Sequence, residues 1–106
     1  MRSITPAFTN QATNATSTAI PGASSNSGCI VQATITGVGA VSATVTLYGN
    51  TTNATTGGVP LGSAISLSGT TMATGGAVDN QGWPWYYVVI TSISGTNAAV
   101  NVNVGI

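Results

Sequence analysis

Charged side chains are almost absent from this sequence. Its 106 residues include one basic residue, Arg2, one acidic residue, Asp79, and no His. Charged residues make up 2% of the chain, whereas about 25% is usual in a soluble domain. A chain without net charge has no electrostatic attraction for nucleic acid or for an anionic membrane, and no repulsion between monomers to oppose association. We therefore expect a protein that assembles with other protein chains, with neither nucleic acid nor a membrane as its partner.

The residue types that carry most catalysis and metal binding are missing as well. General acid–base catalysis usually depends on His, or on carboxylates and amines with tuned pKa values, and here Asp79 is the only carboxyl side chain and Lys is absent. A Ser or Cys nucleophile would have no base to activate it. Zinc and calcium sites need several His, Cys or carboxylate ligands, whereas Asp79 stands alone in a stretch, residues 79–82, that is typical of a turn. We predict no enzymatic activity, no catalytic residue, no metal and no cofactor.

Cysteine pairs and long apolar runs are also lacking. Cys29 is the only cysteine, so an internal disulfide is impossible, and we expect Cys29 to be a small buried residue of a strand. The longest apolar stretch, residues 83–90, is interrupted by Pro84 and falls well short of the roughly 18 residues of a membrane helix. Residues 1–22 lack the apolar segment of a secretory signal, which argues against export by that route. Disorder is disfavoured, because 42% of the residues are hydrophobic and disordered chains normally combine low hydrophobicity with high net charge.

What the sequence does contain is the period-two pattern of β-strands. Apolar and polar residues alternate over residues 29–36, 40–48, 63–68 and 98–104, as expected of half-buried strands. Glycine-containing turns at 37–39 and 95–97 separate neighbouring strands. No segment has a period of 3.6, and the abundant Thr, Val and Gly disfavour helix. Short strands with regular turns predict an all-β protein with a single-domain antiparallel β-sandwich that is jelly-roll-like.

Two polar segments interrupt this pattern. Residues 49–58 begin and end with glycine and predict a hairpin loop of the longer kind. Residues 69–82 are rich in glycine and predict an exposed excursion with at most one short strand.

The N-terminal segment, residues 1–28, is polar and has only Ile4, Phe8 and Ile20 as sizeable apolar residues. That is too little apolar area to offset the cost of ordering the segment alone, which is about 1–2 kcal/mol per residue for the backbone. We predict that residues 1–28 form an arm that lies over a neighbouring subunit and inserts Ile4 or Phe8 into it. Residues 29–106 would form the sandwich domain. The alternative is an edge strand on the chain's own sandwich.

Four of the six aromatic residues lie close together in the sequence, as Trp83, Trp85, Tyr86 and Tyr87. In a strand, Trp83, Trp85 and Tyr87 share one face, Tyr86 lies on the other, and neither face is polar before Thr91. Such a run indicates burial on both sides. We predict that one face belongs to the core and that the other contacts another protein chain. A plain core position at the end of the sandwich and a sugar-binding platform are the alternatives.

Two groups of short motifs resemble those of small virion proteins from tailed bacteriophages. The first is VTLYGN at 45–50 with PLG at 60–62 and ISLSG at 65–69. The second is PWYYV at 84–88 with ISGT at 93–96 and AAVNVNV at 98–104. The likeness covers residues 40–106, and the chain is most similar to capsid cement or decoration proteins with a jelly-roll-like sandwich. Relatives often carry a basic residue in the aromatic strand, where this chain has only apolar ones.

The resemblance implies a structural virion protein that binds the outside of an icosahedral head and staples neighbouring capsid subunits. Its partners would be the major capsid protein and itself, as a homo-oligomeric dimer or trimer. It would be made in the host cytoplasm and reside on the capsid surface. The candidate interface residues are Ile4, Phe8, Trp83, Trp85, Tyr86 and Tyr87. A tail, fibre or baseplate component that recognises a host glycan through Trp83, Trp85 and Tyr86 is the first alternative. A bacterial surface or pilus-like subunit is the second, weakened by the missing signal.

Overall fold

The computed structural model describes residues 4–22 and 28–106, and the secondary structure of these residues is all-β. Seven strands form a single antiparallel sheet. They are β1 (Ile4–Gln11), β2 (Ala15–Thr16), β3 (Ile20–Pro21), β4 (Cys29–Asn50), β5 (Val59–Pro60), β6 (Ile65–Asp79) and β7 (Trp85–Gly105). Within the described residues, no helix has the length and apolarity that a membrane span would require. The predicted all-β class is confirmed.

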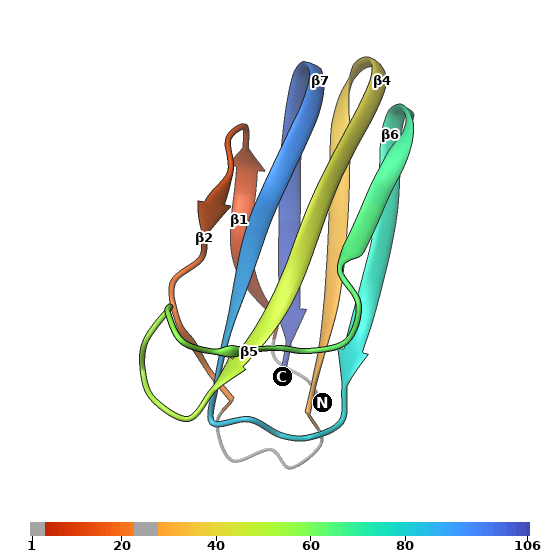
Figure 1. Ribbon diagram of the computed structural model, residues 1–106. Coiled ribbons are helices and arrows are strands. Elements are labelled where there is room, and N and C mark those ends of the chain that lie inside the picture. Colours follow the sequence, from red (N-terminus) through yellow and green to blue (C-terminus); the bar gives the residue numbers. More distant parts are fainter. Residues whose placement is uncertain (1–3, 23–27) are drawn as a thin grey trace.

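Strands β4, β6 and β7 each run along the molecule twice. Figure 1 shows all three folded over at the same end, with one arm in front and one behind. Residues with positive φ lie at these folds: Gly39 (72°) in β4, Thr71 (63°) in β6, and Gly95 (130°) with Asn97 (55°) in β7. Glycine and asparagine tolerate this left-handed region, so the turns at 37–39 and 95–97 lie where the sequence predicts them.

The register sorts the arms into two groups, which we call rear and front after their places in Figure 1. In the rear group, residues 29–36 of β4 pair with 72–79 of β6 and with 99–105 of β7, and β1 pairs with this same arm of β7. In the front group, residues 42–50 of β4 pair with 85–94 of β7, and 40–45 pair with 65–70 of β6. The short strands β2 and β3 continue the front group beside β7, and β5 pairs with the end of β4.

The apolar side chains of the alternating strands form the core. Because successive residues point to opposite faces of a strand, every second residue of each arm turns inward. The innermost apolar side chains are Cys29, Ala33, Ile35, Val45, Val88, Val100, Val102 and Val104, none of which is exposed. Cys29 is therefore a buried strand residue, as the sequence predicts.

The predicted exposed excursion over residues 69–82 is wrong for most of its length. Residues 72–79 pair one by one with residues 36–29 of β4, without a break in register. The inward positions of this arm are Ala73, Gly75 and Ala77, where small residues suffice. A Cβ on Gly75 would already lie 3.1 Å from Ile65 Cγ2. A strand with so little side-chain volume inside shows no apolar alternation, so the sequence pattern missed it.

The predicted N-terminal arm is corrected by the placement of residues 4–22. β1 pairs with β7 of the same chain, and Phe8 is buried in the core together with Ile20. This is the edge-strand alternative. Apolar residues are sparse in this segment because an edge strand needs only a few side chains that point into the core. Residues 1–3 and 23–27 of the predicted 1–28 segment lie outside the described residues.

Candidate functional site

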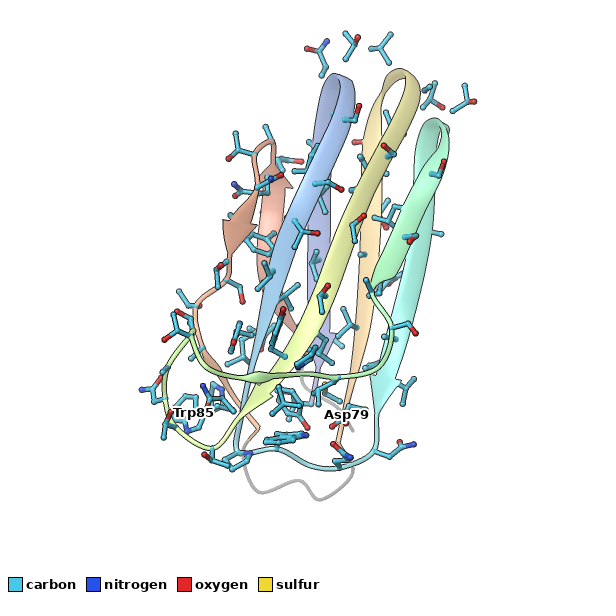
Figure 2. The ribbon with its side chains drawn as sticks, viewed as in Figure 1. Asp79 and Trp85 are labelled. Carbon is cyan, nitrogen blue, oxygen red and sulfur yellow. The ribbon has the colours of Figure 1, made fainter. Side chains whose placement is uncertain are left out.

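The aromatic residues gather at the end of the molecule opposite the three folded turns. Strand β7 begins there with Trp85, and β4 arrives there because Tyr48 pairs with Tyr87 and Asn50 with Trp85. Figure 2 shows Trp85 and Asp79 at this end, on opposite sides of the molecule. We call the set Tyr48, Trp83, Trp85, Tyr86 and Tyr87 the aromatic end.

Tyr86 is the core member of the aromatic end. Its side chain is 1% exposed. The Tyr86 hydroxyl donates a 2.9 Å hydrogen bond to Oδ2 of Asp79 and accepts one of 2.9 Å from the Trp83 backbone N–H. Burial, and then the bond to the carboxylate, raise the pKa of the Tyr86 hydroxyl well above its ordinary value. Tyr86 is thus a neutral donor whose position is set by two hydrogen bonds.

Asp79 has a structural role that the sequence analysis missed. The residue is 6% exposed, and besides the Tyr86 bond it accepts a 3.2 Å hydrogen bond from the Gln81 backbone N–H. The second bond is that of an Asx turn, in keeping with the turn predicted at 79–82. The only hint of the Tyr86 bond in the sequence is that Asp79 is the single acidic residue of the chain.

Tyr87 lies on the opposite face of β7 and is covered by the chain's own loop. Its ring stacks on Tyr48 with a centroid distance of 5.0 Å and an interplanar angle of 3°. Its hydroxyl accepts a 3.0 Å hydrogen bond from the Gly58 backbone N–H. Burial on both faces is therefore present at this position, but the cover over Tyr87 comes from within the chain. The partner predicted for this face is not needed to bury Tyr87.

Asn50 holds the covering loop in shape. Its side-chain Nδ2 donates to the carbonyls of Ala54 and Thr56, each at 3.2 Å. Its Oδ1 accepts from both the backbone N–H and the hydroxyl of Thr52, each at 3.2 Å. These four bonds close residues 51–58 into the longer hairpin loop that the sequence predicts, and they fix the loop against Tyr87.

The two tryptophans keep accessible surface. Trp83 is half-buried and its ring lies over Gly49, where an added Cβ would come within 2.5 Å of it. The Trp83 Nε1 donates a 2.8 Å hydrogen bond to Oε1 of Gln81, which holds the ring in place. Trp85 is also half-buried and pairs with Pro21 and Asn50 on neighbouring strands. The Trp83 ring is thus held in place, and both tryptophan rings can be reached from outside.

The structure therefore separates the six candidate interface residues. Phe8, Tyr86 and Tyr87 are buried within the chain, because their side chains face the core or the covering loop. Ile4, Trp83 and Trp85 remain accessible, with Ile4 59% exposed. Of the six candidates, only these three can contribute to an interface. A glycan platform would have to use Trp83 and Trp85, since the buried ring of Tyr86 has no face for a sugar.

An apolar row on the outer face of the rear group was not foreseen from the sequence. Gly105 pairs with Ile4 on one side and with Ile30 on the other, and Ile30 also pairs with Val78. Ile4, Ile30 and Val78 are 59%, 39% and 65% exposed. The two isoleucines meet over Gly105, where a Cβ would lie 2.8 Å from Ile30 and 3.0 Å from Ile4. Only the register between distant strands brings these side chains together. The outward position of Ile30 in the 29–36 alternation was the sole signal.

A pocket of ≈ 390 Å³ lies beside Asp79, between residues 59–62 and 78–81. Its lining includes the exposed Val59 and Val78 and the buried Leu61. In the described part of the chain, each buried side-chain nitrogen or oxygen has a hydrogen-bond partner. Those residues also include no cluster of His, Cys, Asp or Glu able to hold a metal ion. The pocket is thus lined by apolar side chains, by the carboxylate of Asp79, which is already bonded to Tyr86, and by the exposed polar residues Asn80 and Gln81.

No protein-family model matches this chain, and no match was found among curated proteins or solved structures.

Proposed function

We propose that this chain is a capsid cement or decoration protein, which binds the outer surface of an icosahedral phage head and stabilises contacts between capsid subunits. One observation carries the proposal furthest. Asp79 is the only charged side chain among the described residues, and it is buried. The surface that those residues present is uncharged and includes the accessible Trp83, Trp85 and Ile4. Such a surface favours permanent contact with other protein chains, because no charge repulsion keeps monomers apart in solution.

The motif resemblance over residues 40–106 supports the same function and also implies a fold. We propose a jelly-roll-like sandwich. The rear group follows the order 4–11, 99–105, 29–36 and 72–79, and the front group the order 15–21, 85–94, 40–50 and 65–70. The chain moves between the two groups at each folded turn. Two facing four-segment groups of antiparallel strands with this alternation are what a jelly roll requires.

The proposed mechanism is stabilisation by mass action. A protein that binds the assembled shell but not its dispersed subunits shifts the equilibrium towards the shell. With no charges to contribute, the contacts consist of apolar burial and of hydrogen bonds from Ser, Thr and Asn. Apolar burial contributes about 25 cal/mol per Å² before the costs of association. Repetition over many copies makes weak single contacts effective. The partners are the major capsid protein and further copies of this chain, on the capsid surface after synthesis in the host cytoplasm.

A count of copies per source particle tests this proposal. A cement protein is expected on the order of hundreds of copies per head, because it occupies repeated sites of the lattice. Tens of copies or fewer would overturn it. Such a result would favour the tail or baseplate alternative, for which Trp83 and Trp85 are the accessible rings able to stack on a sugar.

Add-back to heads that lack the protein tests the surface. Wild-type chain is expected to bind and to raise the temperature at which heads release their DNA. Trp85→Ser should weaken binding, whereas Val38→Ser, at an exposed position in the opposite hairpin turn, should not. Equal binding of the two variants would remove Trp85 from the interface, and failure of the wild-type chain to bind would overturn the capsid role.

A further inference from the structure

The two outer edges of the rear group differ in regularity. On one side, β1 has register shifts between Pro6 and Phe8 and between Phe8 and Gln11, and Asn10 has a φ of 49°. On the other side, the β6 arm of residues 72–79 makes eight consecutive pairs with β4 without a shift. Within the described residues, β4 is the only strand that pairs with this arm. The second edge is thus a regular strand whose outer side pairs with none of the described strands.

An open, regular edge presents a row of backbone N–H and C=O groups to which another strand can add. Proteins usually block such edges with proline, a bulge or an outward-pointing charge, above all lysine. β1 has the first two of these devices. Residues 72–79 have none: the arm contains no proline, and Asp79 turns its carboxylate inward to Tyr86. The edge formed by residues 72–79 of β6 can therefore pair with a further strand.

We propose that residues 72–79 form a homodimer edge, where two copies of this chain pair antiparallel about a two-fold axis at Gly75. Met72, Thr74, Gly76 and Val78 point outward, and Ala73, Gly75 and Ala77 point inward. Outward and inward positions alternate along the strand. An axis that passes through a residue pairs outward positions with outward positions, so the outer faces of both copies lie on the same side of the joined sheet. An axis between two residues would pair outward positions with inward ones.

The axis at Gly75 also matches the side chains. It sets Met72 of each copy opposite Val78 of the other, Ala73 opposite Ala77, and Thr74 opposite Gly76. Met72 is 55% exposed and Val78 65% exposed, and cross-strand apolar pairs of this kind stabilise a sheet. The exposed apolar side chains at the two ends of the edge would therefore cover each other twice.

A second copy fits this edge better than an unrelated chain, because the edge is complementary to itself. A two-fold interface requires one surface to match its own rotated image, and Met72 and Val78 lie at equal distances from Gly75 on the same face. No like charges oppose the approach of two such edges. The paired edges would also continue the apolar row of Ile4, Ile30 and Val78 onto Met72 of the second copy. This inference rests on the edge alone and is independent of the proposed capsid role.

Charge pairs introduced at the edge test both the dimer and its register. The wild-type chain is expected to sediment at twice its 10.4 kDa mass at micromolar concentrations. Met72→Lys with Val78→Lys places like charges opposite each other twice and should raise the dissociation constant about tenfold or more. Met72→Lys with Val78→Glu places opposite charges there and should restore the dimer at low salt. Val38→Lys with Thr18→Lys, at exposed sites away from the edge, should leave the dimer unchanged, and circular dichroism should show that all variants are folded.

Each outcome decides the matter. A monomeric wild-type chain, or a dimer that persists with both lysines, would overturn the edge dimer. Equal weakening by the two edge variants would overturn the axis at Gly75. A chain that is monomeric in solution and still decorates heads would remove this inference and leave the capsid role in place.

Discussion

The hydroxyl of Tyr86 donates a 2.9 Å hydrogen bond to Oδ2 of Asp79, and both side chains are buried. Asp79 ends the rear arm of β6, and Tyr86 lies near the start of the front arm of β7. The bond therefore joins the two groups of arms at the aromatic end, and the N–H of Trp83 between them completes the closure. The chain uses its single acidic side chain inside the fold.

Tyr86→Phe should lower the free energy of unfolding by about 1–3 kcal/mol, the usual cost of leaving buried polar groups without partners. The substitution removes the donor to Asp79 and the acceptor for the Trp83 N–H. Urea denaturation measures the change. Tyr48→Phe is the control, since its hydroxyl takes part in no hydrogen bond among the described residues, and it should stay within about 0.5 kcal/mol of wild type. Equal losses in the two variants would contradict a special role for the Asp79 bond.

Stability should fall at alkaline pH because the pKa of Tyr86 is raised in the folded state by burial and by its bond to Asp79. Below the unfolded value, about 10, Tyr86 is protonated in both states and its contribution is constant. Above it, the unfolded state binds fewer protons, so stability falls by up to about 1.4 kcal/mol per pH unit until the folded pKa is reached.

Denaturation at a series of pH values checks this dependence. The wild-type free energy should decline above about pH 10, and the decline should be smaller in Tyr86→Phe. The same alkaline decline in both proteins would assign it to other groups.

Ser17 should contribute to stability through its contact with Val88. The Ser17 backbone N–H donates to the Val88 carbonyl at 2.8 Å, and the Val88 N–H donates to the Ser17 Oγ at 2.9 Å. Ser17→Ala leaves the buried Val88 N–H without an acceptor and should cost about 1–3 kcal/mol in thermal or urea unfolding. The neighbouring exposed Thr18→Ala should cost little. No loss with Ser17→Ala would show that the Ser17 hydroxyl is not needed to satisfy the Val88 N–H.

Gly49→Ala should displace the ring of Trp83, since the added Cβ would lie 2.5 Å from it. We expect a loss of about 1–3 kcal/mol in stability from this overpacking, with a red-shifted fluorescence as Trp83 enters solvent. Recording the emission in a Trp85→Phe background leaves Trp83 as the only tryptophan. Thr51→Ala, an exposed change in the adjacent loop, serves as the control. An unshifted spectrum in Gly49→Ala would show that the ring adapts in place.

Binding to heads, under the proposed function, should be insensitive to salt. The described surface has no charged side chain, so there is almost nothing for added ions to screen. Decorated heads washed in low and in molar NaCl should retain the same amount of protein, whereas a chaotrope should release it. Release by moderate NaCl alone would point to charged contacts that this surface does not supply.

The sequence by itself determined the strands with a strong apolar alternation. Residues 29–36, 40–48 and 98–104 alternate because each side chain's face follows from local backbone geometry. The turns at 37–39 and 95–97 follow from residues that tolerate positive φ. Composition also carries the prediction that the chain performs no acid–base catalysis, because His, Lys and Glu are missing and Asp79 is the only acidic residue.

The tertiary structure alone decided how these strands meet. Residues 72–79 form a strand because β4 offers them a pairing edge, although their own inward side chains are small. Tyr87 is covered by the loop that Asn50 shapes, and Asp79 reaches Tyr86 across the two groups of arms. Ile4, Ile30 and Val78 form one row because the register aligns three strands that are distant in sequence. Such contacts depend on which strand lies beside which, and periodicity within a single strand contains no information about its neighbours.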